Sequence, residues 1–88
     1  MSDPETLFEF PCDFPIKAMG RVDTDVENVV FKIISKHVPG LQQHMLRTRS
    51  SRSGRFVSVT VAIVAQSREQ LDAIYMELSG HPDVLYAL

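Results

Sequence analysis

Arg55-Phe56-Val57-Ser58-Val59-Thr60-Val61-Ala62-Ile63-Val64-Ala65 is the most strand-like run of the chain. Its odd positions from 57 to 63 are all β-branched and apolar, whereas its even positions from 56 to 64 are mixed. A period of two is typical of a strand that has one face in a core and the other face in a wetter setting. The pattern therefore predicts a strand over residues 55–65, around which the other elements can be arranged.

Upstream of this run, the pattern predicts a strand, a helix and a second strand. Residues 14–19 alternate between an apolar face and a face with Lys17 and Met19, and Gly20 is expected to end this strand. Thr24 and Glu27 form a capping box, so a helix is predicted at 24–37. Residues 41–49 are polar and charged, which suits an edge strand, and a turn that includes Gly54 would join it to 55–65 as a hairpin.

Downstream of the run, a second helix and a last strand are predicted. Ser67 and Gln70 repeat the capping pattern, and apolar residues recur at helical spacing until Gly80, which indicates a helix at 68–79. Pro82 restarts an extended chain, and residues 84–88 are expected to form the last strand.

The resulting order, β-α-β-β-α-β, is that of a ferredoxin-like α+β sandwich. In this plan a four-stranded antiparallel sheet carries both helices on one face. The helices should cover the face with Val57, Val59, Val61 and Ile63, and should leave the other face without a helix. We predict an interface on that uncovered face, because such faces usually meet another molecule. Its predicted residues are Phe56, Ser58, Thr60 and Ala62.

Length and composition limit the remaining possibilities. The 88 residues are expected to form an N-terminal arm (1–13), which contains four of the acidic residues as well as apolar ones, and one small domain (14–88). The start of the chain lacks the pattern of a signal peptide, no run of about 18 apolar residues suggests a membrane span, and the single cysteine excludes an internal disulfide. These features favour the cytoplasm.

Charge is distributed unevenly. The net charge of −2 argues against a dedicated nucleic-acid binder. However, four arginines lie within nine positions, and they could hold an anion or the surface of a partner: Arg47, Arg49, Arg52 and Arg55. A solvated edge that discourages strand pairing is the simpler explanation of the four arginines. RNA-recognition motifs share the predicted topology, but here only Phe56 would offer a stacking ring on the two central strands.

Several local runs, taken in their order and spacing, resemble the YbeD-like family of small uncharacterised bacterial proteins. They are Phe8-Glu9-Phe10-Pro11, Phe14-Pro15-Ile16-Lys17-Ala18-Met19-Gly20, His37-Val38-Pro39-Gly40, Ser50-Ser51 with Gly54, Phe56-Val57-Ser58-Val59-Thr60 and Tyr75-Met76-Glu77-Leu78. The resemblance covers about residues 7–88. It implies a ferredoxin-like fold similar to ACT regulatory domains, which bind amino acids, and it implies no established catalytic residue or ligand.

Similarity to ACT domains makes the Met19-Gly20-Arg21 loop a candidate ligand site, since the corresponding loop helps to hold a small effector at a domain interface. The alternative is that Gly20 merely turns the chain. Catalysis has little support: the three histidines show no common metal-ligand spacing, Cys12 lies beside Asp13, and none of the common nucleotide, zinc-protease or hydrolase motifs is present. No metal or cofactor is expected.

The sequence thus favours a non-enzymatic regulatory or protein-interaction module that acts through its uncovered sheet face, as a homodimer or with another protein. The alternative is a sensor of a small, amino-acid-like molecule at a dimer interface. Binding of RNA or another anion through the segment from Arg47 to Arg55 is a third hypothesis.

Overall fold

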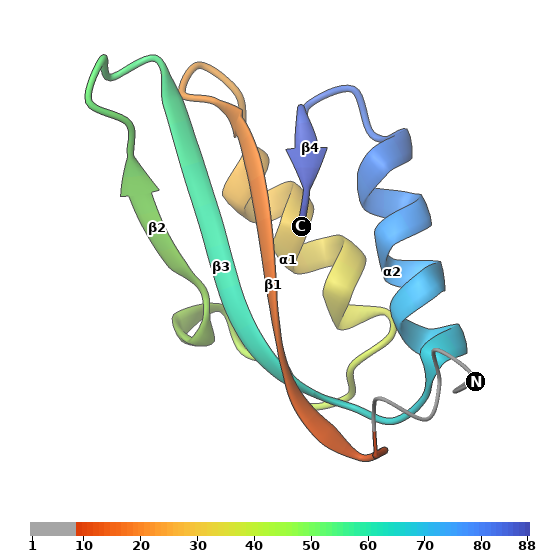
Figure 1. Ribbon diagram of the computed structural model, residues 1–88. Coiled ribbons are helices and arrows are strands. Elements are labelled where there is room, and N and C mark those ends of the chain that lie inside the picture. Colours follow the sequence, from red (N-terminus) through yellow and green to blue (C-terminus); the bar gives the residue numbers. More distant parts are fainter. Residues whose placement is uncertain (1–8) are drawn as a thin grey trace, which may run out of the picture.

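The computed structural model describes residues 9–88, which form one antiparallel sheet and two helices (Figure 1). The elements are β1 (Cys12–Arg21), α1 (Val26–Ser35), a short 3-10 helix η2 (Gln43–Met45), β2 (Arg47–Ser50), β3 (Phe56–Ala65), α2 (Arg68–Gly80) and β4 (Tyr86–Ala87). The strand order in the sheet is β2-β3-β1-β4, and both helices pack against the same face. The predicted ferredoxin-like fold is confirmed.

The two long strands occupy the centre of the sheet. β1 and β3 pair along their whole length, from Cys12 opposite Ala65 to Arg21 opposite Phe56. β2 pairs with only four residues of β3, and the ladder between β4 and β1 is shorter still. The most apolar strands are therefore central because they are the ones that can bury a face against the helices.

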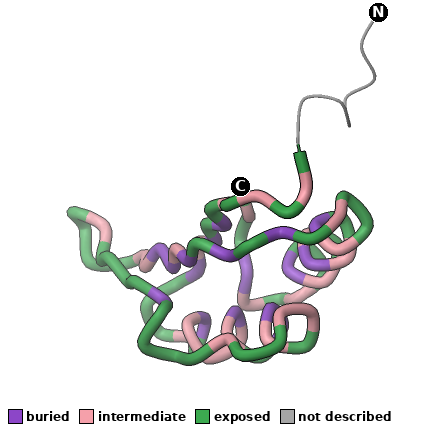
Figure 2. Tube along the Cα trace, turned by 90° about the horizontal axis from the view of Figure 1, so that it is seen from below, coloured by how far each residue is buried: buried purple, intermediate pink, exposed green. Residues whose placement is uncertain are grey.

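The core lies between the sheet and the helices. On β3, Val59 is fully buried and Val61 is 1% exposed, whereas Val64 on the opposite face is 50% exposed. Along each helix, buried residues alternate with less buried ones (Figure 2), because one side of every turn faces the core. The buried apolar residues are Ile16, Ala18, Val26, Val30, Ile33, Ile34, Leu46, Val59, Val61, Ile63, Ala65, Leu71, Ile74, Leu78 and Val84.

The two predicted helix caps have different outcomes. At α2, the Ser67 side chain accepts a hydrogen bond from the Gln70 backbone N–H at 3.1 Å, so this cap is confirmed. At α1, the prediction was wrong, because Asp25 occupies the N-cap position without a side-chain cap and the helix spans Val26–Ser35. The Thr24 hydroxyl instead donates to the Arg21 carbonyl at 2.6 Å and closes the turn after β1.

The predicted strand at 41–49 is also wrong in its first half. Residues Gln43–Met45 form η2, and pairing begins only at Arg47. The segment lacks the alternation that would give a strand one buried face, and only Leu46 is buried. The hairpin that follows is as predicted, and Gly54 has a positive φ of 75°.

The ends of the outer strands also differ from the sequence prediction. β1 continues through Gly20 to Arg21 and begins at Cys12, inside the arm predicted for 1–13. Residues 1–8 of that arm lie outside the described part of the chain. β4 is shorter than the predicted 84–88, although backbone hydrogen bonds from Leu85 to Met19 (2.8 Å) and from Leu88 to Lys17 (2.7 Å) extend its pairing with β1. Neither α1 nor α2 has the length and apolar character needed to cross a membrane.

Candidate functional site

The face of the sheet opposite the helices, here called the open face, is assembled from all four strands. Strand register places side chains in rows across it, because directly paired residues share a face. One row contains Arg49, Ser58, Met19 and Tyr86. The next row contains Arg47, Thr60 and Lys17, and the backbone of Lys17 pairs with that of Leu88. Further along β1 and β3, Pro15 lies opposite Ala62 and Asp13 lies opposite Val64.

The residues predicted as an interface all belong to the open face, but they differ in exposure. Ala62 is exposed, and Phe56 and Thr60 are half-buried. Ser58 is 8% exposed, and its hydroxyl donates to the Arg49 carbonyl at 3.3 Å. The Ser58 side chain therefore links β3 to β2 and leaves little surface for a partner to contact. The interface on this face stays a prediction.

Apolar side chains that the sequence prediction did not single out extend this surface along β4. Leu88 is 68% exposed and Tyr86 is 47% exposed. The Tyr86 hydroxyl donates to the Met19 sulfur at 3.3 Å, which holds the two side chains together across the strands. The sequence could not reveal which face Tyr86 and Leu88 occupy, because the last strand is short and alternation over a few residues carries little information.

The four predicted arginines do not all lie together. Arg47 and Arg49 point to the open face, as their spacing predicts, whereas Arg52 and Arg55 belong to the turn between β2 and β3. Among residues 9–88, no carboxylate forms an ion pair within 4.0 Å of any of them. Nothing in this part of the chain neutralises their charge, which agrees with a role in binding and equally with a solvated edge.

The structure adds a cation that the sequence prediction did not connect with the arginines. Lys17, from the middle of β1, lines a surface hollow of about 470 Å³ together with Arg49 and Arg52. The other residues that line it are Met19, Ser50, Ser51 and Ser58. Lys17 is 32 positions before Arg49 in the chain, so only the strand register brings the two near each other. The sequence did indicate that Lys17 lies on the face of the first strand that points away from the core, and this was the only signal that could have connected it with the arginines.

The candidate ligand loop at Met19, Gly20 and Arg21 is part of β1 and not a turn. Gly20 is buried, and a Cβ atom added to it would lie 2.5 Å from the Asp83 carbonyl oxygen and 2.7 Å from Val26 Cγ2. The space beside Gly20 is therefore filled by the protein itself. Arg21 forms an exposed pair with Asp23 at 3.2 Å, and this hydrogen-bonded pair holds the pKa of Asp23 below its usual value.

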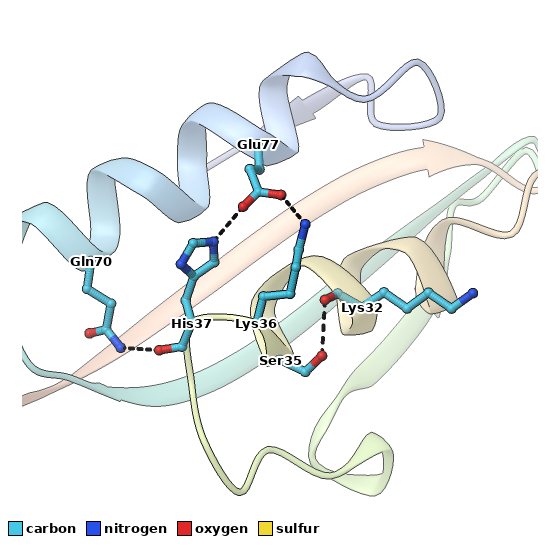
Figure 3. A network of polar contacts seen from close by, with 6 residues as sticks. All are labelled: Lys32, Ser35, Lys36, His37, Gln70 and Glu77. Carbon is cyan, nitrogen blue, oxygen red and sulfur yellow. Dashed lines mark hydrogen bonds and ion pairs between the residues drawn. The ribbon is translucent and has the colours of Figure 1, made fainter.

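On the helix side, a polar cluster joins α1 to α2 (Figure 3). Glu77 of α2 accepts from Lys36 and lies 2.6 Å from His37 Nε2, just after the end of α1. These two contacts lower the pKa of Glu77, with the Lys36 hydrogen bond as the larger cause. The Gln70 side-chain amide donates to the His37 carbonyl at 2.8 Å. The cluster closes the gap between the helix ends and needs no ligand to explain it.

The other polar candidates remain separate. In the part of the chain that is described, no group of three His, Cys, Asp or Glu side chains is placed to hold a metal ion. His81 accepts from the Asp83 backbone N–H at 3.0 Å within its own turn. Cys12 is a half-buried free thiol at the start of β1. A second hollow of about 280 Å³ lies between β3 and the segment after α1, and its lining includes Val38, Leu41 and Met45.

Comparison with solved structures supports the fold. The solution structure of protein HP0495 from H. pylori superposes with a TM-score of 0.66 and covers 92% of this chain and 85% of that chain, at 17% sequence identity. A likeness at this identity shows the shared fold and nothing about a ligand or partner.

Comparison with curated proteins finds relatives of the same size in bacteria. This chain is 43% identical over 89 residues to a "UPF0250 protein" of Chromobacterium violaceum, with both chains covered in full. It is 43% identical over 84 residues to "UPF0250 protein NE1487" of Nitrosomonas europaea, which covers 96% of this chain and 97% of the relative. These matches confirm the resemblance to the YbeD-like family. A family model matches residues 5–88, and the chain therefore belongs to the family described as "Protein of unknown function (DUF493)".

Proposed function

We propose that this protein is a non-enzymatic interaction module that binds an acidic surface of a partner protein through its open face. The observation that supports this most directly is the group of cations without carboxylate partners among residues 9–88, on a face that no described element covers: Lys17, Arg47 and Arg49. Exposed apolar groups at Val64, Tyr86 and Leu88 lie on the same face. Apolar contacts beside a charged region are usual in protein interfaces.

Charge complementarity favours a different protein over a second copy on this face. A twofold dimer formed through the open face would place Lys17, Arg47 and Arg49 of both copies in one interface. Like charges at an interface suppress association, and opposite charges steer it. A homodimer, if it forms, is therefore expected to use the edge of the sheet or the helices and to leave the open face free.

Two other hypotheses have weaker support. A sensor of amino-acid-like molecules at Met19, Gly20 and Arg21 would need space beside Gly20, and that space holds Val26 and the Asp83 carbonyl. RNA binding would need stacking rings on the central strands, where β3 offers only Phe56. Thermal-shift measurements with amino acids test the first, because a ligand of the folded state raises the melting temperature.

The decisive experiment is crosslinking in the source bacterium with two charge-reversal variants. Arg47→Glu with Arg49→Glu reverses charge on the open face, and Lys32→Glu reverses an exposed charge on α1 as the matched control. We expect a captured protein partner that is acidic, that is lost in the open-face variant, and that is retained by Lys32→Glu. Binding of the purified partner should weaken as salt concentration rises.

Two results would overturn the proposal. One is a partner that binds the open-face variant as well as it binds the wild type. The other is recovery of RNA instead of protein from the wild-type crosslinks. Light scattering over a range of concentrations should accompany the experiment, and a dimer that the open-face variant abolishes would show self-association through this face instead.

A further inference from the structure

We infer that the hollow lined by Lys17, Arg49 and Arg52 is a binding site for a phosphate monoester, and specifically for a phosphorylated side chain on the partner protein. The inference rests on the proposed docking function for the identity of the partner. Binding of the phosphate group itself can be measured separately.

The three cations come from three different parts of the fold and surround one space. Lys17 lies on β1, Arg49 on β2, and Arg52 in the turn between β2 and β3. Strands are about 4.8 Å apart and residues on one face repeat about every 6.7 Å, so the Cα atoms of Lys17 and Arg49 are roughly 12 Å apart. Both side chains are long enough to reach an anion between them. The hollow of about 470 Å³ is large enough to accept a tetrahedral phosphate group.

The wall of the hollow is held by hydrogen bonds that do not use the charged groups of Lys17, Arg49 and Arg52. The Ser58 hydroxyl donates to the Arg49 carbonyl at 3.3 Å. Ser51 accepts from the Phe56 N–H through its hydroxyl at 3.1 Å and donates its own N–H to the Phe56 carbonyl at 2.8 Å. Gly54 donates to the Ser51 carbonyl at 3.0 Å and closes the turn that carries Arg52. The serines therefore position the backbone of both arginines before any ligand arrives, which reduces the entropy lost on binding.

The electrostatics of the hollow favour a doubly charged anion. Among residues 9–88, no carboxylate lines it. On the open face of β1, Asp13 lies four residues from Lys17, or about 13 Å along the strand. Asp23 is engaged by Arg21. A phosphate monoester has about two negative charges and three terminal oxygens, which match the forked donors of two arginines and the ammonium of a lysine better than one carboxylate does.

The shape of the site indicates a phosphate that belongs to a larger molecule. Small ligands are usually enclosed by a pocket that buries most of their surface. Here Lys17, Arg49, Ser50 and Arg52 are all exposed, and part of the lining of the hollow belongs to the proposed docking face, namely Lys17, Arg49 and Ser58. A phosphorylated side chain could enter from this side while the rest of its protein contacts the open face.

The test is titration of the full chain, labelled with ¹⁵N, with three versions of one acidic peptide. The versions contain phosphoserine, serine or glutamate at the same position. We expect the phosphoserine peptide to bind at least about tenfold more tightly than the other two, because the phosphate can accept several charge-assisted hydrogen bonds at once from the lysine and the arginines. Amide shifts should concentrate at residues 17–19, 49–52 and 58.

Variants distinguish a specific site, whose side chains contact the phosphate, from a general positive potential on this surface. Arg49→Gln and Lys17→Gln should each weaken binding of the phosphoserine peptide roughly 10- to 100-fold. Arg55→Gln removes the same charge from a residue outside the lining of the hollow, and it should change binding by less than about threefold. The exchanged side chains are exposed, and the amide spectrum of each variant shows whether it is folded.

Three outcomes would overturn the inference. The first is equal binding of the phosphoserine and serine peptides. The second is equal loss with Arg49→Gln and Arg55→Gln, which would show a diffuse field. The third is free phosphoserine that binds as tightly as the peptide, which would assign the site to a small phosphate ester. Loss of phosphate binding while the crosslinked partner still requires the open face would refute only this inference, not the proposed function.

Discussion

Gly20→Ala tests the packing between the end of β1, the start of α1 and the turn before β4. Gly20 has no positive φ, so alanine meets no backbone strain at this position. The added Cβ, however, would lie 2.5 Å from the Asp83 carbonyl oxygen and 2.8 Å from Val26 Cβ. Neither atom is the end of a flexible side chain, and Val26 is only 1% exposed. The backbone of β1, the start of α1 or the turn before β4 would have to move.

The expected magnitude follows from two opposing terms. Overpacking of a core costs about 1–3 kcal/mol. Replacing glycine with alanine restricts the unfolded chain and returns about 0.4–1 kcal/mol. The free energy of unfolding should therefore fall by roughly 1–2 kcal/mol, which lowers the melting temperature by about 5–15 °C in a domain of this size. Circular dichroism during thermal and urea denaturation measures both quantities.

Gly80→Ala is the matched control. Gly80 is the last residue of α2 and has no positive φ, and no heavy atom of the described residues lies within 4 Å of an added Cβ. This variant should equal the wild type or be more stable by up to about 1 kcal/mol. If Gly20→Ala proves as stable as Gly80→Ala, the close approach of Asp83 and Val26 to Gly20 does not exist in solution. The space beside Gly20 would then be open, and the ligand hypothesis for this position would regain support.

Two further predictions concern the helices. Ser67→Ala should lower the free energy of unfolding by about 1 kcal/mol in denaturant titrations, because it removes the cap of α2. Ser79→Ala in the same helix is the control and should leave the free energy of unfolding unchanged. Equal effects of the two variants would exclude a capping role for Ser67. Because Lys36 and His37 lower the pKa of Glu77 in the folded state, its contribution should be complete above its unfolded pKa of about 4.3 and should disappear as pH falls through the lower folded value. The melting-temperature difference between wild type and Glu77→Gln should therefore shrink between about pH 5 and pH 3, and a difference that grows on acidification would contradict the assigned contacts.

Capping motifs illustrate how far the sequence could predict local structure. Thr24 and Ser67 have the same capping pattern in the sequence, yet only Ser67 caps its helix. Thr24 has a competing acceptor, the Arg21 carbonyl, which the end of β1 brings within 2.6 Å. Side chains such as Thr can bond to more than one nearby backbone group, and the surrounding fold decides which bond forms.

The candidate site shows the same limit over a longer range. The spacing of Arg47 and Arg49 was enough to predict that they share a face, because alternation along a strand is a local property. Their relation to Lys17 was not predictable in the same way. It depends on which residues of β1 and β3 pair, and a shift of one residue in that register would turn Lys17 to the core side.

The sequence by itself determined the order of elements and which face of β3 is dry, because periods of 2 and 3.6 are set by local backbone geometry and by the placement of apolar residues. Only the tertiary structure decided three other features: that Gly20 makes room for a carbonyl and a valine, that Thr24 closes a turn, and that Lys17, Arg49 and Arg52 line one hollow. Each of these depends on contacts between segments that are distant in the chain or compete for the same group. The physical reason is that burial patterns are encoded locally, whereas register and close approach are settled only when the sheet and helices pack together.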